Sequence, residues 1–153
     1  MKNITNRINL LLTHGRYKTV PKKRIAEDMV LSLKLNEIFI FGSNLSGHHA
    51  GGAASYARKN FGAMQGISTG RSGRTYAIPT LTQQYEKLSI EGIHYHIEEF
   101  ISYAHLFPHM TFKVSAIGCG IAGFTVEEIA PLFQKAITVK NIQLPEIFWE
   151  HLI

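Results

Sequence analysis

Two glycine-rich segments, each lying between an apolar run and a helical pattern, constrain the fold of this chain most strongly. The first, FGSNLSGHHAGGAA (41–54), overlaps the end of the β-branched and aromatic run EIFIFG (37–42). The second, GCGIAG (118–123), follows TFKVSAI (111–117) and precedes TVEEIAPLFQKAI (125–137), which opens with a Thr-x-x-Glu capping box. A repeated order of strand, glycine turn and helix predicts parallel strands joined by helical crossovers.

The rest of the chain extends this alternation. Small residues over 49–61 and the spacing of apolar residues over 91–106 each predict a helix. TYAIP (75–79) predicts a short strand, 66–74 a loop, and IQLPEIFWE (142–150) a last strand that Pro145 shortens. Pro131 predicts a kink or an irregular start in the helix over 125–137. We therefore expect an α/β fold, a three-layer αβα sandwich with a mixed, mostly parallel sheet.

The first quarter of the chain differs in charge from the rest. Residues 1–36 hold eight basic and two acidic residues, whereas residues 37–153 hold eight basic and nine acidic ones. Apolar spacing predicts one amphipathic helix over 3–14 and another over 22–34. We expect a basic helical extension, 1–36, attached to a near-neutral domain, 37–153. Nucleic-acid binding through the extension is an alternative that we favour less than ligand binding by the domain.

Composition narrows the class of protein further. The chain has 153 residues, 45% of them hydrophobic and 18% charged, which suits one domain with its own core. A single cysteine excludes a disulfide framework and favours a reducing compartment. No apolar run approaches the ~20 residues that cross a bilayer, and no signal peptide is evident. We expect a cytoplasmic protein without a membrane partner.

The first glycine-rich segment carries residues suited to a ligand at a strand end. Gly42, Ser43 and Asn44 stand at the end of the predicted strand, where parallel sheets bind their ligands. Gly51 and Gly52 allow close backbone approach at the start of the next helix, whose amino terminus favours an anion. A tight turn with glycines for packing explains this segment equally well when it is taken alone.

The second segment has the Gly-x-Gly-x-x-Gly spacing of phosphate-binding loops, at Gly118, Gly120 and Gly123. A dinucleotide fold of the usual kind would place an acidic residue about 20 positions later, and 138–140 holds none. The function that remains for this segment is phosphate binding by its loop. Together, the two glycine-rich segments suit a ligand with two separated polar groups. Cys119 is better explained as a small buried residue than as a nucleophile, because no spacing ties a histidine to it.

Histidine and arginine side chains add three candidates. His49 lies in the first glycine-rich segment and is a candidate acid or base, although a solvent-facing loop histidine is the alternative. Arg71 and Arg74 would be placed to steer an anion, but arginines in loops are more often simply solvated. The other histidine pairs lack the spacing of metal ligands, so we expect no metal and no cofactor.

Taken together and in this order, these segments resemble the macrodomain family, whose members bind ADP-ribose and its derivatives. The resemblance covers roughly residues 37–150. SNLSGHHAGGAA is similar to the ribose-binding loop of the family, and GCGIAGFTVEEIAPLF to its phosphate-binding loop and following helix. The chain looks closest to small phage-encoded and prophage-encoded macrodomain-like proteins. It is also similar to the IGCG-loop branch of terminal ADP-ribose glycohydrolases and ADP-ribose-1''-phosphate phosphatases.

The resemblance implies a ligand-binding site formed by both glycine-rich loops. Backbone N–H groups of the second loop would hold a diphosphate, and the first loop would line the distal ribose, with Phe124 stacked nearby. Asn44 and His49 would be the catalytic pair if the site also hydrolysed its ligand. The ligand-binding residues implied in this way are Gly42, Ser43, Asn44, Leu45, Gly51, Gly52, Ala53, Thr80, Gly118, Cys119, Gly120, Ile121, Ala122, Gly123 and Phe124.

Two departures from the family pattern bear on function. The glycohydrolase branch uses a lysine where this chain has Leu81 or Thr82, and an aspartate where it has Ala122, so that mechanism is disfavoured. Asp28 is the only aspartate in the chain, so an adenine-binding carboxylate would have to be Asp28 or Glu37. We expect binding of ADP-ribose or a related NAD-derived nucleotide. The alternative is hydrolysis of ADP-ribose-1''-phosphate or of an ADP-ribosylated substrate.

Overall fold

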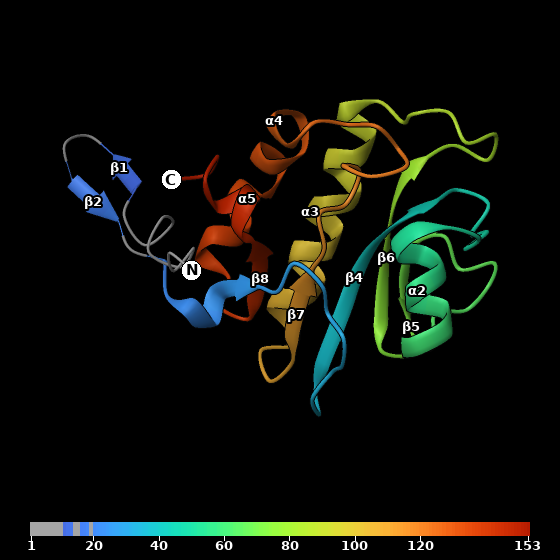
Figure 1. The fold of residues 1–153 in the computed structure, drawn as a ribbon, viewed down its shortest axis with the longest axis horizontal. Coiled ribbons are helices and arrows are strands. Elements are labelled where there is room, and N and C mark those ends of the chain that lie inside the picture. The colour runs from blue at the N-terminus through green and yellow to red at the C-terminus, as the bar shows by residue number, and fades with distance from the viewer. Residues whose placement is uncertain (1–10, 14–15, 19) are drawn as a thin grey trace.

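The computed structural model describes residues 11–13, 16–18 and 20–153 (Figure 1). Its main sheet has six strands in the order β3-β8-β7-β4-β6-β5, of which only β5 is antiparallel to its neighbour. The strands of this sheet are β3 (Ile25–Ala26), β4 (Glu37–Asn44), β5 (Gly70–Ser72), β6 (Thr75–Leu81), β7 (Thr111–Val114) and β8 (Ile142–Pro145). The α/β class and the mixed, mostly parallel sheet are confirmed.

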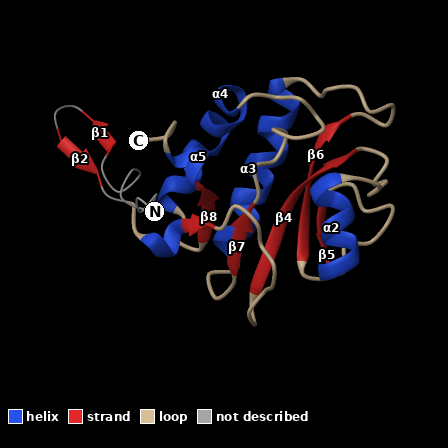
Figure 2. Cartoon of the chain, viewed as in Figure 1, coloured by secondary structure: helices blue, strands red, loops and turns tan. Residues whose placement is uncertain are grey.

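Helices cover both faces of the sheet (Figure 2). The helical elements are η1 (Lys22–Arg24), α2 (Gly52–Phe61), α3 (Ile90–Leu106), α4 (Val126–Ile129), η2 (Ala130–Thr138) and α5 (Glu146–Trp149). α2 packs on β4, whereas α3 packs on β6 and on η2. The predicted capping box is confirmed, since Thr125 and Glu128 cap the start of α4 reciprocally. Within the described part of the chain, no helix is both long and apolar enough to cross a bilayer.

The side chains of β4 show why the sheet needs a helical layer on each face. Successive residues of a strand point to opposite faces. Ile38 and Ile40 enter the core on the α3 side, while Phe39 and Phe41 enter the core on the α2 side. All four are almost completely buried. A strand that is apolar on both faces is stable only between two layers, which agrees with the expected three-layer arrangement.

One predicted loop contains a strand, and two prolines interrupt predicted elements as the sequence indicated. Residues 70–72, expected in a loop, form the edge strand β5 beside β6. The last predicted strand ends at Pro145, and α5 follows it. The helix expected over 125–137 is regular only as far as Ile129 and continues as the 3-10 helix η2. Pro131 lies at the start of η2, where its missing N–H interrupts the α-helical hydrogen bonds.

The helices predicted for the N-terminal quarter are wrong where the structure describes them. β1 (Leu11–Thr13) and β2 (Arg16–Lys18) pair as an antiparallel hairpin instead of ending a helix. The remainder of the helix expected over 3–14 lies outside the described residues.

The helix expected over 22–34 is also replaced by other structure. Only the three residues of η1 are helical there, and Ile25 and Ala26 add β3 to the edge of the sheet beside Leu144 and Pro145. A segment that we expected outside the domain therefore extends its sheet. The division of the chain after residue 36 stays a prediction.

Arg24 attaches this segment to the C-terminal part of the chain. Its side chain is almost buried and donates hydrogen bonds to the carbonyls of Ala136 at 2.9 Å, Ile137 at 3.1 Å and Ile142 at 2.9 Å. The guanidinium carbon lies 5.1 Å from the ring centroid of Trp149, whose indole N–H donates to the Arg24 carbonyl at 2.9 Å. Carbonyl oxygens near the end of η2 thus satisfy a buried positive charge.

Replacing Arg24 with alanine is expected to lower the free energy of unfolding by about 3 kcal/mol, because three carbonyls lose their donor. Equilibrium unfolding in urea measures the change. Lys23→Ala, at the exposed neighbouring position, is the control and should alter stability by less than about 0.5 kcal/mol. Equal stability of the two variants would contradict the role given to Arg24.

Candidate functional site

A cavity of about 530 Å³ opens at the carboxyl ends of β4, β6 and β7. The chain order reverses at this place, because β6 lies on one side of β4 and β7 on the other. Both glycine-rich segments contribute to its walls. The predicted site residues that line it are Gly42, Ser43, Asn44, Gly51, Gly52, Ala53, Thr80, Gly118, Gly120, Ile121 and Ala122.

The first turn of α2 faces this cavity without a cap. Gly51, which precedes the helix, has no side chain to accept the first N–H groups, and the first turn holds no acidic residue. N–H groups at a helix start have no partner within the helix and carry the positive end of its dipole. Gly52, Ala53 and Ala54 all line the cavity, so this end of α2 is available to an anion.

The second glycine-rich loop presents further backbone donors to the same cavity. Among the described residues, nothing accepts a hydrogen bond from the N–H groups of Gly120, Ile121 and Ala122. The described residues that line the cavity include no lysine and no arginine. The cavity therefore offers an anion two sets of main-chain N–H groups rather than a cationic side chain.

The side chain of Ile121 connects the two loops across the cavity. It is 77% exposed, yet its Cδ1 would lie only 3.2 Å from a Cβ atom added to Gly51 and 3.1 Å from one added to Gly52. Gly52 also has a φ of 56°, a conformation that residues with side chains rarely adopt. The backbone conformation therefore favours glycine at Gly52 but not at Gly51, which is extended, and a side chain at either position would require Ile121 to shift slightly.

Asn44 shapes the first loop from inside. Its Oδ1 accepts hydrogen bonds from the Ser46 hydroxyl at 2.6 Å and the His48 N–H at 3.1 Å, and its Nδ2 donates to the His48 carbonyl at 2.9 Å. The hydroxyl of Ser43 likewise donates to the carbonyl of Ser68. Both residues line the cavity, and these hydrogen bonds of their side chains hold the loop in place.

His49 lies outside the cavity lining, which removes the geometry that an acid or base needs. Its side chain is fully buried, its ring centroid is 5.1 Å from that of Phe41, and its Nε2 lies 3.1 Å from the Ile67 carbonyl. The backbone N–H of His49 donates to Gln65 Oε1 at 2.7 Å. His49 therefore anchors the first loop, and the exposed His48 lines the cavity in its place.

Four further predicted site residues lie outside the lining, namely Leu45, Cys119, Gly123 and Phe124. Phe124 belongs to the core on the α3 side, so it does not stack in the cavity. Lys87 Nζ lies 4.9 Å from its ring centroid and donates to the Gly123 carbonyl at 2.9 Å. Burial, followed by the charges of Glu127 and Glu128, raises the pKa of the Cys119 thiol, which favours the structural explanation of this cysteine.

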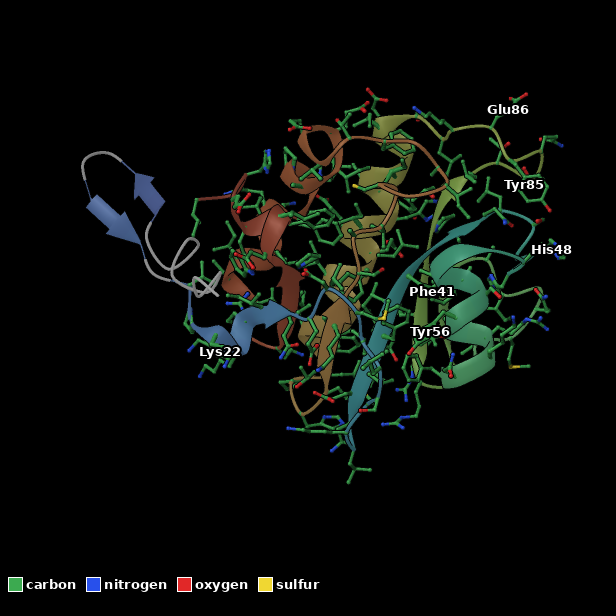
Figure 3. All side chains as sticks on the ribbon, in the orientation of Figure 1. Lys22, Phe41, His48, Tyr56, Tyr85 and Glu86 are labelled. Atoms are coloured by element: carbon green, nitrogen blue, oxygen red, sulfur yellow. The ribbon has the colours of Figure 1, made fainter. Side chains whose placement is uncertain are left out.

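Residues without a recognisable motif complete the cavity. Asp28 comes from the segment before β4, Tyr85 from the loop after β6, and Ser115 from the end of β7. Figure 3 shows His48 and Tyr85 on the same side of the molecule, whereas Phe41 lies further inside. Tyr85 has a φ of 63°, which is uncommon for a residue with a side chain. The other lining residues that were not among the predicted site residues are His48, Ala50, Ala54, Leu81, Ala116 and Ile117.

A second cavity of about 300 Å³ adjoins the first and is more apolar. The residues shared by the two cavities are Asp28, Gly52, Ala53 and Ser115. The residues that line only the second are Glu27, Met29, Val30, Phe39 and Tyr56. Asp28 thus stands at the boundary between them. Glu37, the other carboxylate considered for base recognition, pairs with Lys113 and lines neither cavity.

The two arginines expected to steer an anion make other contacts. Arg74 donates to the carbonyls of Leu33 and Lys34, and Arg71 donates to that of Gly73. Neither lines the cavities. Over the described ranges, no three His, Cys, Asp or Glu side chains are grouped so that they could hold a metal ion.

Comparisons of this chain with protein-family models, with curated proteins and with solved structures find no match. The macrodomain family accordingly stays an expectation from the sequence.

The burial of His49 predicts a pH-dependent stability. Burial lowers its pKa, and the carbonyls of Ile67 and Met64 offset only part of this effect. In the unfolded chain the imidazole takes up a proton near about pH 6.5, whereas in the folded chain it does so only at lower pH. The stability contributed by the neutral imidazole is therefore complete above about pH 6.5 and decreases as the pH falls below it.

Urea unfolding at about pH 7.5 and about pH 5.5 should show a lower free energy of unfolding at the lower pH. His49→Gln should reduce this difference. His96→Gln should also reduce it, since burial lowers the pKa of His96 as well. His105→Gln, at an exposed position, is the control. A difference that His49→Gln leaves unchanged would show that the histidine is not held neutral.

Proposed function

We propose that this protein binds ADP-ribose or a closely related NAD-derived nucleotide in the cavity at the carboxyl ends of β4 and β7. The observation that carries the proposal is the presence of two main-chain donor sets in one cavity, at the start of α2 and at 120–122. A diphosphate suits this arrangement, because its oxygens accept several N–H groups and do not require a cationic side chain.

The two cavities together suit the remaining parts of such a nucleotide. Their volumes of about 530 and 300 Å³ lie in the range of small-molecule sites. The apolar cavity suits a planar base, since Phe39 and Tyr56 line it and the Asp28 carboxylate is able to accept a hydrogen bond from an exocyclic amine. The larger cavity also contains His48 and Tyr85, polar groups suited to a sugar.

The macrodomain resemblance of the sequence supports the same ligand. It assigns the diphosphate to the second glycine-rich loop and the distal ribose to the first, and most of the residues that it implies line one cavity. It also requires a carboxylate for adenine, and Asp28 lies where the two cavities meet.

Calorimetric titration with ADP-ribose tests the proposal. The wild-type chain should give saturable heat below about 1 mM ligand, and Gly52→Val should weaken binding at least about tenfold. The reason is that a side chain at Gly52 would occupy the space beside Ile121 and displace the start of α2.

Gly70→Val is the matched control for this titration. Gly70 has a φ of 91°, so its backbone is equally unsuited to valine, but it lies in β5 and an added Cβ meets nothing within 4 Å. It should bind ADP-ribose as the wild type does. If the folded wild-type chain gives no heat of binding at about 1 mM ADP-ribose, the proposed function is wrong.

A hydrolase acting in the same cavity is a second candidate, favoured by the exposed imidazole of His48 in the lining. In hydrolysis of ADP-ribose-1''-phosphate, water attacks phosphorus and the bond to the sugar oxygen breaks, with His48 able to protonate that oxygen. Release of inorganic phosphate by the wild type, lost in His48→Gln, would support turnover. No phosphate release by a chain that binds ADP-ribose would leave binding alone.

A further inference from the structure

Residues 27–36, here called the strap, contain no helix or strand and yet form part of the wall of both cavities. Asp28 lines both cavities, and Met29 and Val30 line the apolar one. Because the strap lacks regular backbone pairing, side chains from other elements have to hold it in place.

Lys113, on β7, makes an ion pair with the first residue of the strap. Its Nζ donates to Glu27 Oε1 at 2.7 Å and to Oε2 at 2.9 Å, and it lies 3.3 Å from Glu37 Oε2. The other oxygen of Glu37 accepts the N–H of Lys34 at 2.6 Å. One ammonium group, on a side chain that is almost buried, is therefore linked to both ends of the strap.

The side chains of Arg74 and Tyr56 contact the strap further along the chain. Arg74 Nη2 donates to the carbonyls of Leu33 at 2.9 Å and Lys34 at 2.5 Å. The Tyr56 hydroxyl lies 3.5 Å from the carbonyl of Leu31. Among these contacts, the ion pair of Lys113 with Glu27 is nearest along the chain to Asp28, which lines both cavities.

The charges of this ion pair are stabilised by each other. Burial alone would lower the pKa of Lys113, but Glu27 and Glu37 outweigh it and raise that pKa above its ordinary value. Burial alone would raise the pKa of Glu27, but the hydrogen bond and charge of Lys113 outweigh it and lower that pKa. Both groups are therefore charged throughout the neutral pH range.

We propose that Lys113 and Glu27 are positioning residues that set the preference of the site for a base with an exocyclic amine. This inference rests on the proposed function. Glu27 directly precedes Asp28, so the ion pair holds the backbone that carries Asp28 at the boundary of the two cavities. Lys113 lines neither cavity and acts on the ligand only through the strap.

The test compares ADP-ribose with its counterpart in which hypoxanthine replaces adenine, so that a carbonyl replaces the amine. The wild-type chain should prefer ADP-ribose, and Asp28→Ala should abolish the preference. Glu27→Gln should reduce the preference by about fivefold, because a neutral amide no longer holds the strap to Lys113. A merely structural effect would weaken both nucleotides equally and leave their ratio unchanged.

Glu27→Gln leaves the core intact because the Glu27 side chain is 56% exposed, but Glu27 itself lines the apolar cavity. Lys113→Met is therefore the decisive variant for a positioning role, since Lys113 lines neither cavity. Lys113→Met should change the ratio in the same direction. The ion pair of Lys135 with Glu98, 3.0 Å apart between η2 and α3, offers matched controls of the same residue types. Glu98→Gln and Lys135→Met should leave the ratio unchanged.

Amide hydrogen exchange without ligand gives a second readout. Exchange over 29–33 should be faster in Glu27→Gln than in Glu98→Gln, because the strap loses its attachment to β7. A wild-type preference that Glu27→Gln leaves unchanged overturns the positioning role and not the proposed function. A wild-type chain that binds neither nucleotide overturns the proposed function, and the positioning role with it.

Discussion

The parallel pairing of β4 with both β6 and β7 is the constraint on which the rest of the structure depends. It brings the carboxyl ends of three strands to one edge of the sheet. The loops that leave these strands surround the cavity at that edge. The two loops come close together here, since a Cβ atom added to Gly42 would be in ordinary van der Waals contact with the Gly118 nitrogen, at 3.5 Å. The glycine-rich loops allow this close approach, and residues of both loops line one cavity.

Two buried cations attach the N-terminal segment to this framework by different means. Arg24 is satisfied by three carbonyls near the end of η2 and on β8, whereas Lys113 is satisfied by the carboxylates of Glu27 and Glu37. Buried charges are tolerated only when they are paired or fully hydrogen-bonded, so each cation restricts the path of the chain beside it. The wall that contains Asp28 is therefore positioned by these electrostatic contacts together with the pairing of β3 and β8 just before it.

The sequence predicted the location of the candidate site better than the roles of individual residues. Glycine spacing located both loops, because a need for positive φ or close approach is a local property of the backbone. It did not distinguish His48 from His49, since neighbouring residues in an irregular loop point in directions that only their contacts decide. The ring of Phe41 and the carbonyl of Ile67 draw His49 inside and leave His48 in the cavity.

By itself the sequence determined the order of the elements from β4 onward except for β5 and α5, together with the layered architecture and the edge of the sheet where a cavity forms. These follow from periodicity, glycine positions and capping residues, which act over a few neighbours. Only the tertiary structure decided the backbone conformation of residues 22–36. Their apolar spacing favours a helix, but strand pairing with β8 and the contacts of Arg24 and Lys113 favour an extended path. Partners so distant along the chain outweigh local preference, because pairing and buried charge contribute more than helix propensity does.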